Sequence, residues 1–195
     1  MVAAVRRATR EDLDEMAAIL ADGFAEDPLL TWMFPSEEQY ARLAPDYFRW
    51  MADKALNFGQ AYLADGKGVL LGQPSSTVEP DEEWATVGRQ AAREALAECA
   101  DNAIAYIDAT RRNHPMEEPH WYAEYMAVRS QFRSEGIGIL LWRHSFEENR
   151  TPVYLESTKP RNTQTYRGLG FEVTGRFPVG DEVQMTSMWR RQIGR

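Results

Sequence analysis

A short segment with two closely spaced glycines joins a strand pattern to a helix pattern, and it constrains the fold more than any other part of the sequence. The strand pattern runs from His120 to Val128, and the helix pattern follows the loop. The loop residues are Arg133, Ser134, Glu135, Gly136, Ile137 and Gly138. Glycines at a helix start let the backbone approach an anion, and the first-turn amides then point at it. The segment therefore indicates either a phosphate-binding loop or a plain helix N-terminus with a favourably placed acid.

Strand and helix patterns alternate along the whole chain. Apolar alternation and short apolar runs predict strands over 2–7, 60–64, 69–72, 120–128, 152–157, 171–177 and 182–189. Apolar residues at helical spacing predict helices over 10–27, 37–56, 81–112 (as one helix or two), 137–149 and 162–169. The turn Asp65-Gly66 predicts a hairpin between the second and third strands. We therefore expect one α/β domain, residues 1–195, with a mixed sheet.

Charge and composition argue against several functions. The formal net charge is −8 and the cations are scattered, so we expect no nucleic-acid partner and no membrane partner. No apolar run approaches the ~20 residues that a membrane span needs. Cys99 is the only cysteine, and the N-terminus lacks a secretory pattern, so we expect a cytoplasmic protein without an internal disulfide.

Two familiar phosphate-binding motifs do not fit the glycine loop. A Walker loop needs Gly-Lys-Ser or Gly-Lys-Thr, which this segment lacks. A dinucleotide fingerprint needs a third glycine where the chain has Leu141. The remaining pattern, Arg/Gln-x-x-Gly-x-Gly, is too common to identify a site by itself.

A second segment gives the loop a more specific meaning. Residues 162–171 match the pattern Asn-x-x-x-Tyr-x-x-x-Gly-Phe through Asn162, Tyr166, Gly170 and Phe171. With the loop, this segment resembles the GNAT superfamily of acyl-CoA-dependent N-acetyltransferases. The segment 24–28 further resembles the opening of the puromycin N-acetyltransferase branch. The resemblance implies a mixed, mostly antiparallel sheet of six to seven strands, flanked by helices, with splayed central parallel strands.

The resemblance also implies acetyl-CoA as cosubstrate, without a metal. The loop amides, from Arg133 to Gly138, would bind the pyrophosphate of CoA at the helix N-terminus. The preceding strand would run beside the pantetheine arm through the backbone of Met126, Ala127 and Val128. Asn162 would hydrogen-bond the pantetheine or cap its own helix.

Three residues are candidates for the proton transfers of acyl transfer to an amine. The resemblance makes Tyr166 the general acid for the thiolate, and the alternative is a core tyrosine packed behind Phe171. Strict alternation places Glu124 on one strand face with Tyr122, Met126 and Val128, facing the acceptor. Glu124 is therefore a candidate base, or binds the ammonium group. Glu156 on the next strand would assist deprotonation or brace the site, and the base stays open between the two acids.

The acceptor site is predicted from fewer observations. Tyr122, Glu124, Trp32 and Asp27 are candidate substrate contacts, although Asp27 before a proline is also typical of a helix cap. The leading function is acetyl transfer to a primary amine of a small molecule, such as an antibiotic or related metabolite. The alternatives are a peptide or protein amine as acceptor, and a non-catalytic CoA-binding regulator. The sequence leaves a monomer or homodimer open.

Two positions depart from the family pattern. Relatives commonly have proline at the position of Ser130 and a cation near Glu135. An acid beside a pyrophosphate should weaken CoA binding unless Glu135 faces solvent while Arg129 and Arg133 compensate.

Overall fold

The computed structural model describes residues 3–78 and 82–191, with side chains in the second range from residue 86. Val2 and Asp81, expected at the starts of a strand and a helix, lie outside the described residues. A single seven-stranded sheet forms the centre of the fold, in the order β1-β2-β3-β4-β5-β7-β6. The strands are β1 Val5–Arg7, β2 Gln60–Ala64, β3 Gly68–Pro74, β4 Trp121–Val128, β5 Val153–Ser157, β6 Glu172–Val179 and β7 Val183–Arg190.

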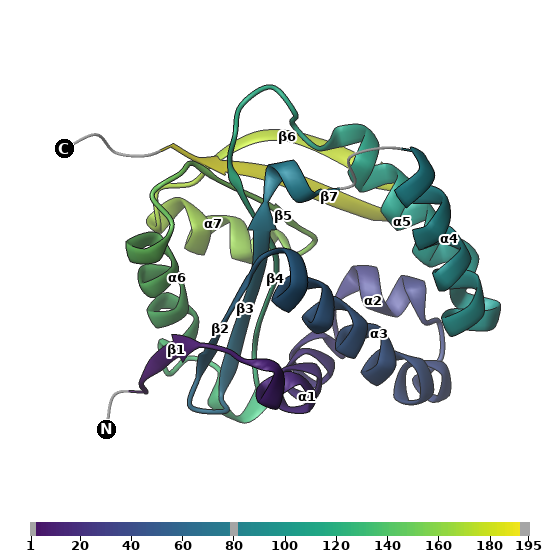
Figure 1. Ribbon diagram of the computed structural model, residues 1–195, viewed down its shortest axis with the longest axis horizontal. Helices are drawn as coiled ribbons and strands as arrows, with labels where there is room; N and C mark the ends of the chain where they lie inside the picture. Colours follow the sequence, from purple (N-terminus) through teal and green to yellow (C-terminus); the bar gives the residue numbers. More distant parts are fainter. Residues whose placement is uncertain (1–2, 79–81, 192–195) are drawn as a thin grey trace.

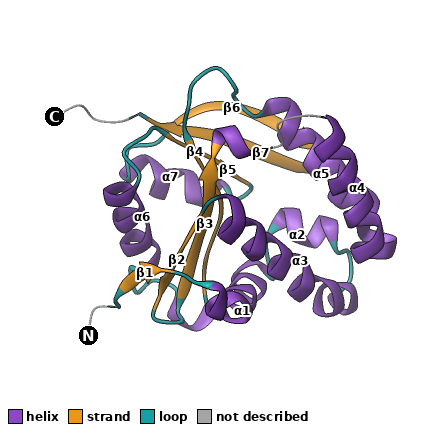
Figure 2. Ribbon diagram, viewed as in Figure 1, coloured by secondary structure: helices purple, strands orange, loops and turns teal. Residues whose placement is uncertain are grey.

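Helices cover both faces of this sheet (Figures 1 and 2). They are α1 Leu13–Phe24, α2 Pro28–Met33, α3 Glu37–Phe58, α4 Glu82–Leu96, α5 Ala100–Asn113, α6 Ile137–Glu148 and α7 Pro160–Gly168. Short 3-10 turns are η1 Arg10–Asp12, η2 Ser75–Thr77, η3 Ala97–Cys99 and η4 Ser130–Phe132. Helices α6 and α7 lie on one side and α1 to α5 on the other, so each face buries its own apolar cluster.

The parallel pair β4 and β5 lies in the middle of the sheet and separates along its length. All other neighbouring strands are antiparallel. The pair is in register only from Trp121↔Val153 to Ala123↔Leu155. Beyond Ala123 the two strands diverge, so the backbone of 124–128 has no strand partner on the β5 side. The fold class and the splayed central strands are confirmed.

Most element boundaries agree with the sequence patterns, and the differences have local causes. The expected 81–112 helix is two helices, because a 3-10 turn with Ala97 at φ 46° interrupts it. Helix α2 was not predicted, since its six residues are too few to show a helical period. Helix α7 begins at Pro160 rather than Asn162, so Asn162 is not the cap and that alternative is wrong.

Helix α1 packs unusually close to β4 at one point. A Cβ atom added at Gly23 would lie 2.7 Å from the Cβ of Ala127. Only glycine permits this approach without moving a backbone. The contact buries the Ala127 side chain against α1, so this residue has only its backbone to offer to a cofactor.

Candidate active site

A slot opens where β4 and β5 separate, and it brings together most of the predicted site residues. Its volume is about 70 Å³. The predicted residues that line it are Asp27, Tyr122, Glu124, Met126, Glu156, Asn162 and Tyr166. These side chains come from the start of α2, from β4 and β5, and from α7, which are far apart in sequence. The slot is therefore the candidate active site.

A β-bulge at Glu124 decides which side chains of β4 face which side. Leu71 pairs with Tyr125 and the next residue, Gly72, pairs with Ala123, so Glu124 has no partner on β3. The prediction that Glu124 shares a face with Met126 and Val128 is therefore wrong. Met126 and Val128 pack with the cluster under α6 and α7, while Glu124 contacts α3. The extra residue breaks the period of two, and it lies where β4 leaves β5.

Glu156 lies at the centre of a hydrogen-bond network of tyrosines. The hydroxyls of Tyr122 and Tyr154 each donate to its carboxylate at 2.9 Å. Burial, opposed by these two hydrogen bonds and reinforced by the charge of Glu124, raises the pKa of Glu156 to about 7. A carboxyl group with this pKa can take up and release a proton near neutral pH.

Glu124 is held differently, by a cation. Lys54 of α3 donates to both of its oxygens, at 3.0 and 3.3 Å. Both side chains are largely buried, with 26% and 11% of the Lys54 and Glu124 side chains exposed. Lys54 already occupies the Glu124 carboxylate, whereas Glu156 accepts only from neutral hydroxyls, so the geometry favours Glu156 over Glu124 as the base.

Tyr166 reaches the slot from α7. Its ring packs against Trp142 and Phe171, as the core interpretation predicts, and the residue is 8% exposed. Its hydroxyl nevertheless has no hydrogen-bond partner among the described residues. Burial, with the charge of Asp27, raises the pKa of Tyr166 to about 12, so the phenol stays protonated at neutral pH.

The glycine loop leaves a helix N-terminus open to an anion. Gly136 is the residue before α6 and has φ 79°, a conformation that favours glycine, with open space around it. No side chain caps α6, so its first amides have no partner from a cap. The terminus thus fits a pyrophosphate, as the loop prediction requires.

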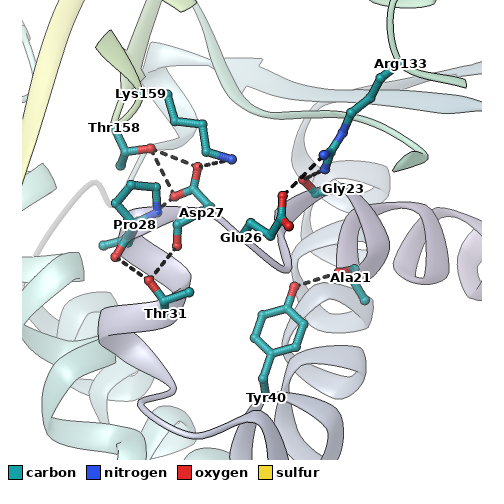
Figure 3. Close-up of polar contacts among 11 residues, drawn as sticks. Ala21, Gly23, Glu26, Asp27, Pro28, Thr31, Tyr40, Arg133, Thr158 and Lys159 are labelled. Carbon is teal, nitrogen blue, oxygen red and sulfur yellow. Dashed lines mark hydrogen bonds and ion pairs between the residues drawn. The ribbon is translucent and has the colours of Figure 1, made fainter. Parts of the chain in front are cut away.

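The charged residues of the loop point in different directions. Arg133 contacts Glu26 at 3.4 Å and the carbonyl of Gly23 at 3.3 Å, which ties the loop to α1 (Figure 3). Glu135 is half exposed and lies 3.7 Å from Lys67 of the β2–β3 turn. The charge that Glu135 brings to the loop is therefore partly balanced by a lysine that the sequence analysis did not single out.

Asp27 is already well bonded. Its carboxylate accepts from the amide of Leu29 at 3.0 Å and from Thr158 at 2.9 and 3.0 Å, and it lies 3.5 Å from the Lys159 ammonium (Figure 3). It is only 4% exposed. These contacts cap α2 and join it to the segment before α7, so the geometry favours the cap over contact with a substrate amine.

The predicted acceptor contact Trp32 lies elsewhere. Its ring packs beside Gly180 at the β6–β7 turn, and it is absent from the described lining of the slot and of the larger cavity next to it. That cavity measures about 420 Å³ and lies among α3, α4, α5 and β4. It shares Tyr106, Tyr122 and Glu124 with the slot, so the two spaces meet at these residues.

Sequence reasoning missed several residues of this region. Trp50 and Lys54 belong to the apolar stripe and the charged surface of α3, and both line the larger cavity. Tyr154 was assigned only to a strand, yet it bonds Glu156. Its spacing of two from Glu156 on the same strand was the one available signal, since residues i and i+2 share a face.

None of the helices described here is long and apolar enough to cross a membrane. Within the described part of the chain, no group of three or more His, Cys, Asp or Glu side chains could hold a metal ion.

Comparison with known proteins agrees with the observed fold. The family description "Acetyltransferase (GNAT) family" matches residues 28–171. A histone acetyltransferase HPA2 and related acetyltransferase of Corynebacterium glutamicum is 25% identical, with a TM-score of 0.73 over 100% of this chain and 99% of that one.

Two insect enzymes share the fold at lower identity. Arylalkylamine N-acetyltransferase 2 of Aedes aegypti is 14% identical, with a TM-score of 0.71 over 98% of this chain and 99% of that one. The polyamine N-acetyltransferase of Drosophila melanogaster, which forms N-acetylagmatine, is also 14% identical, with a TM-score of 0.67 over 97% of this chain and 99% of that one. These likenesses do not separate the puromycin branch from other branches. The chain belongs to the acetyltransferase (GNAT) family, whose members use acetyl-CoA.

Proposed function

We propose that the protein transfers an acetyl group from acetyl-CoA to the primary amine of a small molecule. The observation that carries this proposal is the slot at the β4–β5 divergence, which holds an acid, a base and an open stretch of backbone beside a larger cavity. The alternative of a non-catalytic CoA-binding regulator is less favoured, because such a protein has no need of Glu156 and Tyr166 in one slot. An antibiotic as the acceptor stays a prediction from the branch resemblance.

Acetyl-CoA would supply the reactive thioester. The residues that would hold it are the amides around Gly136 for the pyrophosphate, and the unpaired backbone of 124–128 for the pantetheine arm. The amide of Met126 would donate to the thioester carbonyl. The side chain of Asn162, which has no hydrogen-bond partner among the described residues, would bond the pantetheine.

Glu156 would take the proton that the acceptor ammonium must lose before the amine can attack. Its pKa of about 7 makes the carboxylate available at neutral pH, and the two tyrosine hydroxyls keep it oriented. The acceptor nitrogen would reach it from the side of Tyr122, where the slot meets the larger cavity.

Tyr166 would donate a proton to the departing thiolate, because its hydroxyl is protonated and free of other partners. Direct transfer in a ternary complex follows from this arrangement, since acid and base line one slot. The test is thiol release from acetyl-CoA with a panel of amines, alongside CoA binding by calorimetry. CoA binding without stimulation by any amine would remove the proposal.

A further inference from the structure

We propose that the larger cavity selects monoamines with an apolar body and disfavours diamines. The inference rests on the proposed function and concerns the acceptor side of the same site. The cavity lies between α3, α4 and α5, on the face of the sheet opposite α6 and α7 (Figure 1). Its volume of about 420 Å³ is in the range of small-molecule sites.

The mouth of the cavity is apolar to an unusual degree. The large hydrophobic side chains that the described residues leave exposed are Trp50, Phe58, Val87 and Met116. The first three, which are 40%, 47% and 56% exposed, all line this one cavity. Single exposed hydrophobic residues are ordinary, but three around one opening mark a surface that an apolar ligand covers.

The inner end of the cavity is where the amine must lie. Tyr106, Tyr122 and Glu124 line both the cavity and the slot, so a nitrogen there would reach Glu156 while its carbon body extends outward between α3 and α4. Met51 and Ile107 provide further apolar wall along this path. The acceptor is therefore an amine at one end and hydrocarbon or an aromatic ring over the rest.

The charged groups among the described lining residues leave no unpaired acid for a second ammonium group. Among the described lining residues the acids are Asp53 and Glu124, and the bases are Lys54 and Arg111. Asp53 pairs with Arg10 at 2.7 Å, and Glu124 with Lys54 at 3.0 Å. Both acids are thus already neutralised by a cation of the protein.

A diamine must therefore enter with one cation unpaired, or lose a second proton. An alkyl ammonium group has a pKa near 10.4, three units above pH 7.4. Binding it in the neutral form therefore lowers the affinity by about 1000-fold. Because the rim is open to solvent and relieves part of this cost, we expect a preference of about 100-fold for the monoamine.

The test compares two acceptors of equal chain length, n-hexylamine and hexane-1,6-diamine, by their kcat/KM values at pH 7.4. We expect hexylamine to be favoured about 100-fold, and the series from butylamine to octylamine to gain roughly threefold per methylene. A wild-type protein that uses the diamine as well as the monoamine would overturn the proposal.

Two surface variants test the proposal on the protein itself. Val87→Asp places an unpaired acid at the mouth, where the second ammonium group would lie, and should improve the diamine at least tenfold relative to hexylamine. Met116→Ser removes the exposed hydrophobic residue outside the cavity, so it should leave the ratio unchanged. An equal effect of Val87→Asp and Met116→Ser would overturn the assignment of the cavity.

Calorimetry separates a failure of this inference from a failure of the proposed function. Alkylamines are titrated into the protein with CoA present and without turnover. If no amine stimulates thiol release but affinity still rises with chain length, the acetyl-transfer proposal fails while the cavity keeps its assignment. If turnover occurs but neither affinity nor kcat/KM depends on chain length, the cavity is not the acceptor site.

Discussion

Glu156→Gln tests the assignment of the base most directly. The substitution keeps the size of the side chain and one oxygen that accepts from Tyr122 or Tyr154, but it cannot take up a proton at neutral pH. With a pKa of about 7, the carboxyl group is about one-tenth ionised at pH 6 and nine-tenths ionised at pH 8. The kcat/KM of the wild type should therefore rise about tenfold between these values.

The variant should lose both rate and pH dependence. General-base assistance is worth about 100- to 10,000-fold, so kcat/KM at pH 8 should fall by that factor. The rise centred near pH 7 should disappear. Glu124→Gln is the matched control, because it removes the neighbouring acid and should leave an inflection in the neutral range. If Glu156→Gln retains the inflection near pH 7, the base is another group.

The same substitution has a consequence for folding stability. The folded pKa of Glu156 lies above the ordinary value of 4.5, so the fold favours the protonated form. Its stabilising contribution is present below pH 4.5 and is lost as pH rises through about 7, by about 3 kcal/mol at most. Denaturant unfolding at pH 5 and pH 8 should show this loss in the wild type and not in Glu156→Gln. An equal loss in both proteins would contradict the burial argument.

Three further predictions concern the remaining groups. Tyr166→Phe should lower turnover about 100-fold while the Kd of CoA in calorimetry stays within about twofold; an unchanged rate would remove Tyr166 from the chemistry. Glu135→Gln should tighten CoA about two- to fivefold at low salt and less at high salt, because a half-exposed charge is screened; no change at low salt would mean that only the loop backbone meets the cofactor. Burial lowers the pKa of His114 to about 4, so its contribution to stability is present above pH 6.5 and is lost as pH falls toward 4. The contribution of Glu156 has the opposite sign and offsets part of this loss. The free energy of unfolding of Glu156→Gln should therefore fall more steeply than that of the wild type between pH 6.5 and 4. A smaller fall than in the wild type would contradict this assignment.

Local patterns carried much of the fold and the cofactor side of the site. The glycine loop, the Asp65-Gly66 hairpin and the segment from Asn162 to Phe171 each depend on residues close together in sequence. Their backbone conformations follow from turn chemistry and periodicity, so the sequence predicts them without knowledge of the packing. The fold class and the splay of the central strands followed from the family resemblance that these segments carry.

The acceptor side depended on contacts between distant residues. The bulge at Glu124 exists because β3 and β4 differ by one residue in register, and period-two reasoning on one strand cannot detect it. The ion pair of Lys54 with Glu124 spans 70 residues, and Asp27 meets Thr158 across 131. No local pattern predicts such pairs.

The sequence by itself thus determined the order of most elements, the glycine-led start of α6 and the presence of two carboxyl groups and a phenol as candidate site groups. Only the tertiary structure decided which acid is neutralised by lysine and which is held by neutral hydroxyls, and where an apolar cavity meets the slot. The physical reason is that the pKa and the accessibility of a side chain depend on its burial and on nearby charges. Packing brings these groups together from distant parts of the sequence.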